Sequence, residues 1–145
     1  MKPINEMKLS FEGRSCNEGF ARSAVAAFVA MLDPNMEELS DIKTAVSEAV
    51  TNCIVHGYRD KIGTVYIHVK IFEGARVSIN IKDRGCGIED VKKAMEPLFT
   101  TCETGERAGL GFSIMGSFMD KLKVRSKPDR GTSVTLEKTI VSKGK

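Results

Sequence analysis

Two regular alternations of apolar and polar residues predict strands in the middle of the chain. From Thr64 to Phe72, and again from Arg76 to Lys82, valine or isoleucine stands at every second position. A period of two is typical of a strand with one buried face. Glu73-Gly74-Ala75 between the two runs favours a hairpin turn. Weaker or shorter alternations predict three more strands, at residues 7–12, 121–126 and 132–138.

Apolar residues at helical spacing predict three helices. Ser15-Cys16-Asn17-Glu18 has the form of a capping box that opens the first helix, and Asp33-Pro34 ends it. The second runs from about Ser40 to His56 and stops at Gly57. The third opens at Gly109. Because strands pair by hairpins while helices group together, we expect an α+β fold, a two-layer α/β sandwich with a mixed, mainly antiparallel sheet and helices on one face.

Size and composition narrow the class of protein. The 145 residues fit a single domain, and 28% charged with 41% apolar residues is ordinary for a soluble protein. A net charge of +3 is too small to indicate nucleic-acid binding. Four cysteines without a Cys-x-x-Cys pair argue against a zinc site and suit reduced thiols in the cytoplasm. No long apolar run is present, so we expect no membrane association.

A carboxylate and two glycines follow the second strand of the hairpin, in the sequence Asp83-Arg84-Gly85-Cys86-Gly87. Glycines at this spacing allow a tight loop whose backbone approaches a ligand closely. Taken alone, this pattern is more often an ordinary turn. Two other segments reverse that preference.

The second predicted helix carries a polar stripe made of Glu48, Asn52 and His56, spaced four residues apart. The stripe lies beside the apolar face, where a helix can line a pocket. An asparagine carbonyl is a suitable ligand for Mg²⁺, and Glu48 could deprotonate a nucleophile near that metal. The alternative is a solvated helix flank.

Gly109-Leu110-Gly111 stands at a predicted helix start, where free amides and the helix dipole favour a phosphate. A flexible hinge is the alternative. Residues from Met95 to Ala108 lack periodicity and indicate a loop that could act as a lid. Within this loop Arg107 could meet a terminal phosphate, although surface arginines are commoner. Gly131-Thr132 before the last strand would, by itself, be a plain turn.

Taken in order, these four motifs resemble the four boxes of the GHKL ATPases, the superfamily of gyrases and histidine kinases. The match covers roughly residues 45 to 135. It implies the Bergerat nucleotide fold with ATP or ADP and Mg²⁺ as ligands. The resemblance further implies that Asp83 binds the adenine amino group, that Asn52 ligates Mg²⁺, and that Glu48 and Arg107 are catalytic, with residues 100–111 as the ATP lid. The nucleotide-binding residues it implies are Asn52, Asp83, Gly85, Gly87, Thr101, Gly109, Leu110, Gly111 and Thr132.

One branch of the superfamily is the most similar. Glu48-Ala49-Val50-Thr51-Asn52, followed by His56-Gly57-Tyr58, looks like the small bacterial anti-sigma factors that are also serine kinases, above all their sporulation members. The resemblance implies a homodimer that holds a sporulation sigma factor inactive. It also implies a second partner, an anti-anti-sigma protein that is inactivated by phosphorylation on a serine.

Two other functions remain open at this point. One is a non-catalytic binding module that ATP and ADP switch by ordering and releasing the lid. The other is a detached histidine-kinase catalytic domain, which would give acid-labile phosphohistidine on its partner. Transfer of labelled phosphate to a partner separates all three.

Overall fold

The computed structural model describes residues 2–59, 61–88 and 108–141. Its strands are β1 (Asn5–Glu12), β2 (Thr64–Phe72), β3 (Arg76–Asp83), β4 (Lys121–Lys127) and β5 (Gly131–Thr139). Its α-helices are α1 (Glu18–Val29), α2 (Met36–Asn52) and α4 (Ala108–Phe118), with 3-10 turns at Ser15–Asn17 and Ala30–Leu32 and a π-helical turn at Cys53–Gly57.

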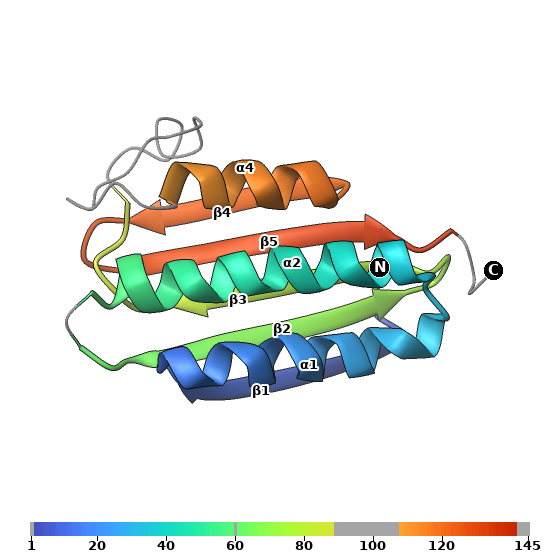
Figure 1. The fold of residues 1–145 in the computed structure, drawn as a ribbon, viewed down its shortest axis with the longest axis horizontal. Helices are drawn as coiled ribbons and strands as arrows, with labels where there is room; N and C mark the ends of the chain where they lie inside the picture. The colour runs from blue at the N-terminus through green and yellow to red at the C-terminus, as the bar shows by residue number, and fades with distance from the viewer. Residues whose placement is uncertain (1, 60, 89–107, 142–145) are drawn as a thin grey trace.

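The strands form one sheet in the order β1-β2-β3-β5-β4, and every described pair of neighbours is antiparallel. The three α-helices lie side by side on one face of this sheet (Figure 1). This confirms the predicted two-layer α+β sandwich. The sheet was expected to be mixed and mainly antiparallel, and its described part is antiparallel throughout. Among the described residues no helix is both long and apolar enough to cross a membrane.

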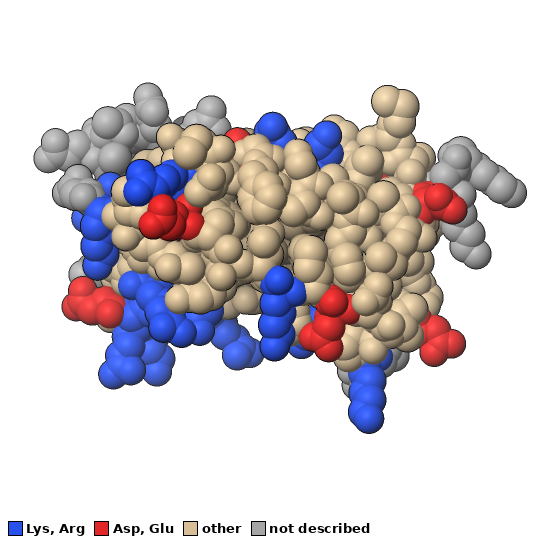
Figure 2. Space-filling model, turned by 90° about the horizontal axis from the view of Figure 1, so that it is seen from below, with Lys and Arg blue, Asp and Glu red and all other residues tan. Residues whose placement is uncertain are grey.

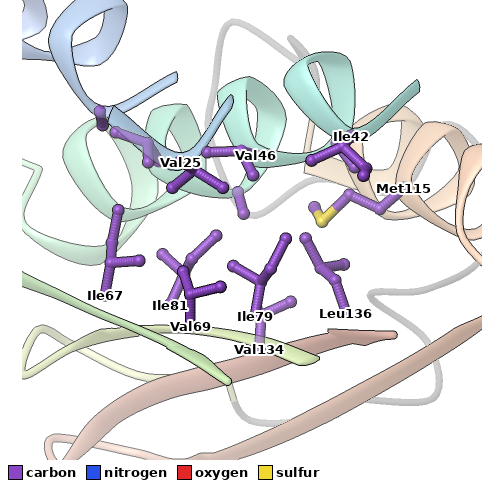
Figure 3. Packing of buried hydrophobic residues seen from close by; sticks show 14 of the residues in the cluster. Val25, Ile42, Val46, Ile67, Val69, Ile79, Ile81, Met115, Val134 and Leu136 are labelled. Carbon is purple, nitrogen blue, oxygen red and sulfur yellow. The ribbon is translucent and has the colours of Figure 1, made fainter. Parts of the chain in front are cut away.

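The apolar residues of the strands and those of the helices pack together in one core. Figure 3 shows Val25, Ile42, Val46 and Met115 pointing down from the helices onto the valines, isoleucines and Leu136 of the sheet. Each of these labelled helix residues is fully buried. Burial of one such side chain stabilises the fold by about 1.5–3 kcal/mol. The apolar pattern therefore fixes which face of each element meets the other layer.

The capping box lies at a different helix from the one predicted. Ser15 begins a 3-10 turn and is not the N-cap of α1, because that helix begins at Glu18 and its N-cap is Asn17, whose side-chain amide donates to the Glu12 carbonyl at 2.9 Å. The capping box is found at α2 instead. There the Asn35 side chain accepts from the Glu38 amide at 2.7 Å, and Glu38 accepts from the Asn35 amide at 3.0 Å. This cap starts α2 at Met36, four residues before the predicted start at Ser40.

Candidate functional site

Pairing between β3 and β5 brings two of the sequence motifs together. Asp83, the last residue of β3, stands opposite Thr132 near the start of β5. These residues are 49 positions apart in the chain and become neighbours only through the sheet register. Both lie at the end of the sheet where α2 also ends (Figure 1). The Asp83 loop and the Gly131-Thr132 turn therefore lie side by side at one end of the sheet.

The Asp83 carboxylate is held in a defined position. Its side chain is buried, with 3% of the residue exposed, and its Oδ1 accepts from the Gly85 amide at 2.9 Å. Burial raises the pKa of Asp83, while hydrogen bonds from the Gly85 backbone, the Cys53 thiol and the Thr132 backbone oppose that rise. The outcome is a buried carboxylate with a fixed direction, which suits recognition of a hydrogen-bond donor.

Two glycines let the loop pack against the end of α2. A Cβ on Gly85 would lie 2.0 Å from the Gly57 carbonyl oxygen, and a Cβ on Gly57 would lie 2.7 Å from Asp83 Oδ2. With no side chains at these positions, the Cys86 amide donates to the Gly57 carbonyl at 2.9 Å. Gly57 was expected only to end a helix. It also makes room for the carboxylate.

The second glycine of the loop, Gly87, has a left-handed backbone with φ of 75°. A side chain there would be strained, and its Cβ would lie 2.0 Å from the Lys127 carbonyl oxygen. Ser126 on β4 fixes the far end of the same loop. Its hydroxyl accepts from the Ile88 amide at 2.7 Å and donates to the Gly131 carbonyl at 2.9 Å. Since a hydroxyl has one proton, the Thr132 hydroxyl is the donor in its own 2.9 Å contact with Ser126.

Tyr58 connects the end of α2 to the start of β2 and to the Asp83 loop. Its ring is buried, with 4% exposed, and burial raises the pKa of its hydroxyl. That hydroxyl donates to the Thr64 carbonyl at 2.5 Å and accepts from the Arg84 amide at 2.7 Å. The wider π-helical turn of residues 53–57 leads directly into this tyrosine, whose amide donates to the Cys53 carbonyl at 2.9 Å. The turn thus sets the position of the residue that holds the loop.

Glu48 and Asn52 lie one turn apart near the C-terminal end of α2, both partly buried. Within the described residues, neither polar atom of the Asn52 amide has a hydrogen-bond partner, although both atoms are buried. Buried polar groups are nearly always paired, so this amide is a candidate to bind a ligand. An asparagine carbonyl fits Mg²⁺, which binds few protein ligands and keeps water and phosphate oxygens around it.

Two hollows in the described surface border this end of the molecule. One of about 480 Å³ follows α2 and reaches Glu48, with Arg22 of α1 on its wall. The other, of about 370 Å³, is lined by Tyr58, Gly85 and Cys86 among others. The surface of α2 as far as Glu48 and the glycine loop are therefore both hollowed.

Part of the predicted site lies outside the described residues. This part comprises Thr101, Arg107 and the predicted lid from residue 100 to residue 107. The backbone of Gly109-Leu110-Gly111 lies in the first turn of α4, which begins at Ala108. The predicted helix start is thus confirmed to within one residue.

Two residues of this region, Ser126 and Cys53, were not predicted from the sequence as parts of a site. Ser126 carried a signal, because it occupies an inward position in a strand whose other inward residues are Leu122 and Val124. A polar residue in an apolar row needs partners, and here it has three. Cys53 carried none, since a buried thiol within an apolar stripe is an ordinary core residue.

Most of the chain, residues 17–138, matches the family model of the histidine kinase-like ATPase domain. This range contains α1, α2, the glycine loop and nearly all of the sheet except β1. The family model thus covers all the candidate residues described above.

Curated relatives are similar over almost the whole length of both chains. The anti-sigma F factor of Thermoanaerobacter sp. (strain X514) is 56% identical over 142 residues, which is 98% of this chain and 99% of the relative. The anti-sigma F factor of Halalkalibacterium halodurans is 54% identical over 94% of this chain and 93% of its own. This chain therefore belongs to the family of histidine kinase-like ATPase domains and, among them, to the anti-sigma F factor family.

Solved structures show the same fold at low sequence identity. The RsbU and RsbW domains of Rv1364c from Mycobacterium tuberculosis align over 95% of this chain and 33% of that one, with a TM-score of 0.69 and 17% identity. The histidine kinase domain from Erythrobacter litoralis aligns over 88% of this chain and 63% of that one, with a TM-score of 0.58 and 19% identity. The expected Bergerat-type fold is confirmed.

Proposed function

We propose that this protein is an ATP-dependent protein serine kinase that also binds a sporulation sigma factor and holds it inactive. Membership of an ATPase-domain family supports nucleotide binding, and relatives named anti-sigma F factor support the sigma-binding role. The substrate of the kinase would be an anti-anti-sigma protein, phosphorylated on a serine. The protein would act as a homodimer with soluble partners in the cytoplasm.

The Asp83 end of the site would bind the base. An ionised carboxylate accepts hydrogen bonds only, so it favours the exocyclic amino group of adenine over the carbonyl of guanine at that place. Gly85, Gly87 and Thr132 would complete this end, since the Gly85 and Thr132 backbones donate to the carboxylate and Gly87 belongs to the same loop. The hydrogen bond between Gly85 and Asp83 keeps the carboxylate aimed before the nucleotide arrives.

The α2 end of the site would bind the phosphates. Asn52 would ligate Mg²⁺, which supplies neutralisation of phosphate charge when it is bound. The amides at the start of α4, at Gly109, Leu110 and Gly111, would face the phosphates, because a helix N-terminus favours anions. Thr101 and Arg107 would contribute from the lid, Arg107 at the terminal phosphate.

Glu48 would be the general base. It lies one helical turn before Asn52, so it can reach a nucleophile beside the metal without holding the nucleotide. In the transfer step the serine Oγ forms a bond to the γ-phosphorus, the bond from that phosphorus to ADP breaks, and the serine proton passes to Glu48. The protein contributes position and charge rather than a covalent intermediate.

The observation that carries this proposal is the buried amide of Asn52. Among the described residues both of its polar atoms lack partners, and it stands on the same stripe as Glu48. On a solvated helix flank these atoms would be paired with water. A metal and phosphate oxygens would supply the partners that they lack.

Phosphate transfer with purified components tests the proposal. The chain is incubated with γ-labelled ATP, Mg²⁺ and a purified anti-anti-sigma protein from the same organism, and the product is treated with acid. Acid-stable label on a serine is the expected result. Acid-labile label would indicate a histidine kinase, and nucleotide binding without any transfer would indicate a switched binding module. A pull-down with the sigma factor tests the second activity separately.

A further inference from the structure

The face of the sheet that carries no helix is strongly basic on one side. Along β4 the exposed and half-buried residues alternate, and the exposed ones are Lys121, Lys123, Arg125 and Lys127. Figure 2 views the molecule from the α1/β1 edge and shows that Lys and Arg side chains also project there from the side opposite the helix layer. Side chains at every second position of a strand stand about 6.6–6.8 Å apart. The edge strand therefore presents an evenly spaced row of four cations.

The basic surface extends inward from β4. Register pairing places Arg125 beside Ser133 of β5 and Ser133 beside Lys82 of β3, so Lys82 belongs to the same face two strands away. A hollow of about 170 Å³ there is lined by Lys82, Arg125, Lys127 and Arg130 among others. We call Lys82, Lys121, Lys123, Arg125, Lys127 and Arg130 the basic surface.

Acidic partners for these side chains are scarce within the described part of the chain. No ion pair joins any of the basic-surface residues to a described carboxylate. The one outward-facing carboxylate of β5, Glu137, contacts Arg76 of β3 instead, at 3.2 Å. A group of like charges without counter-charges is costly to hold together and favours an anionic partner.

The edge of β4 also offers backbone groups. In the described residues β4 pairs with β5 alone, so its other edge can accept a further strand. Lysines on an edge strand can serve simply to prevent such pairing. Prevention of strand pairing would need positive charge on β4 only. It would not explain the positive charges of Lys82 and Arg130, which lie outside β4.

We propose that the outer edge of β4 binds an extended acidic segment of a partner protein as an added strand. Carboxylates at every second position would stand directly across from Lys121, Lys123, Arg125 and Lys127. The residues between them would meet Leu122 and Val124, which are half-buried and pack against the core, so those positions should be apolar. The partner is thus a strand in which acidic and apolar residues alternate. This inference does not depend on phosphate transfer.

A nucleic acid is the other polyanion that a basic face could bind. Sheets that bind single strands do so with aromatic side chains on which bases stack. Among the described residues, the outward positions of β3, β5 and β4 hold no aromatic residue. Tyr66 of β2 stands across from Lys82, but the Arg84 guanidinium already lies over its ring, 5.0 Å from the centroid. The surface therefore favours an acidic peptide over a nucleic acid.

Binding of a labelled peptide to the full-length protein tests this proposal. The probe alternates glutamate and valine and is as long as β4, which has 7 residues. The affected variant is K123Q/R125Q. The matched control is K8Q/K70Q, which removes the same charge from the same face on the β1–β2 side. Thermal unfolding of both variants shows that each is folded.

The probe should bind the natural protein, more weakly as salt rises, and should protect β4 amides from hydrogen exchange. Because exposed ion pairs contribute about 0.2–1 kcal/mol each, we expect loss of two pairs in K123Q/R125Q to weaken binding about two- to thirtyfold and K8Q/K70Q to bind unchanged. Equal loss in both variants would overturn the proposal. So would equal binding of a peptide with its glutamates and valines in separate blocks, or tighter binding of a single-stranded oligonucleotide.

Discussion

The two ends of the candidate site differ in how completely their polar groups are paired. At the Asp83 end, the carboxylate, the loop amides and the hydroxyls of Tyr58, Ser126 and Thr132 bond to one another. At the α2 end, the Asn52 amide is buried without a partner among the described residues. The first end is complete before a ligand arrives. The second has polar atoms that a ligand would satisfy. Under the proposed function the first end would recognise the base and the second would hold the reacting phosphate.

This contrast predicts that Glu48→Gln removes chemistry and spares binding. Glutamine keeps the shape of the side chain but cannot accept the serine proton, and loss of a general base lowers rates about 10²–10⁴-fold. ATP affinity and capture of the sigma factor should stay unchanged. A timed phosphate-transfer assay, with calorimetry and a pull-down on the same sample, measures all three. Transfer at the natural rate would remove Glu48 from its proposed role.

Asn52→Ala should act through the metal. Loss of a residue that only orients a metal ligand typically costs about 10–100-fold in metal affinity, so loss of a direct ligand should weaken Mg-ATP binding by at least about tenfold. Binding of ATP without Mg²⁺ should change little. Since the mutation removes buried polar atoms that have no described partner, the free energy of unfolding should not fall. Titration calorimetry with and without Mg²⁺ checks this, and an equal loss in both conditions would count against a metal ligand.

The Asp83 end should select the base. Hydrogen bonds that involve a charged group contribute about 1.5–3 kcal/mol, so ATP should bind at least about tenfold more tightly than GTP. Competition between the two nucleotides for a fluorescent ATP analogue gives the ratio. Equal affinities would exclude Asp83 from base recognition.

Tyr58→Phe should destabilise the Asp83 end of the site without preventing nucleotide binding. The change leaves the Arg84 amide and the Thr64 carbonyl without the hydroxyl, and an unsatisfied buried group costs about 1–3 kcal/mol. Chemical denaturation should show a loss of stability in that range, with a smaller loss of ATP affinity. Tyr66→Phe is the matched control, because Tyr66 stands on the outward face of β2. A loss of the same size in the control would show that the Tyr58 contacts are not responsible.

The smallest expected effect concerns pH. Burial raises the pKa of Asp83, so the folded protein binds this proton more tightly than the unfolded chain does. The ionised carboxylate therefore destabilises the fold, fully near neutral pH and progressively less as pH falls through the raised pKa toward 3.8, the ordinary value. Asp83→Asn should be more stable than the natural protein near neutral pH, and the difference should shrink in acid. Thermal unfolding across this range measures it, and a constant difference would contradict the prediction.

Much of the fold could be read from periodicity. The predicted limits of β2, Thr64–Phe72, are those observed, because strict alternation leaves only one register that buries the isoleucines. The start of α2 was misplaced, although Asn35 and Glu38 have the spacing of a capping box. Ser15 and Glu18 have the same spacing, but α1 begins only at Glu18 and its N-cap is Asn17. Spacing alone therefore does not show which of two such pairs caps a helix.

The sequence by itself determined the types of residue in the site and the elements that carry them. Asp83 after a strand, Asn52 on a helix and Thr132 before a strand were all identifiable from local pattern. Tertiary structure alone decided which of them meet, because the β3–β5 register sets Asp83 opposite Thr132 across 49 positions. It also decided that Gly57 makes room for the carboxylate and that Tyr58 holds the loop. Such contacts depend on backbone atoms that every residue shares, so no side-chain pattern encodes them.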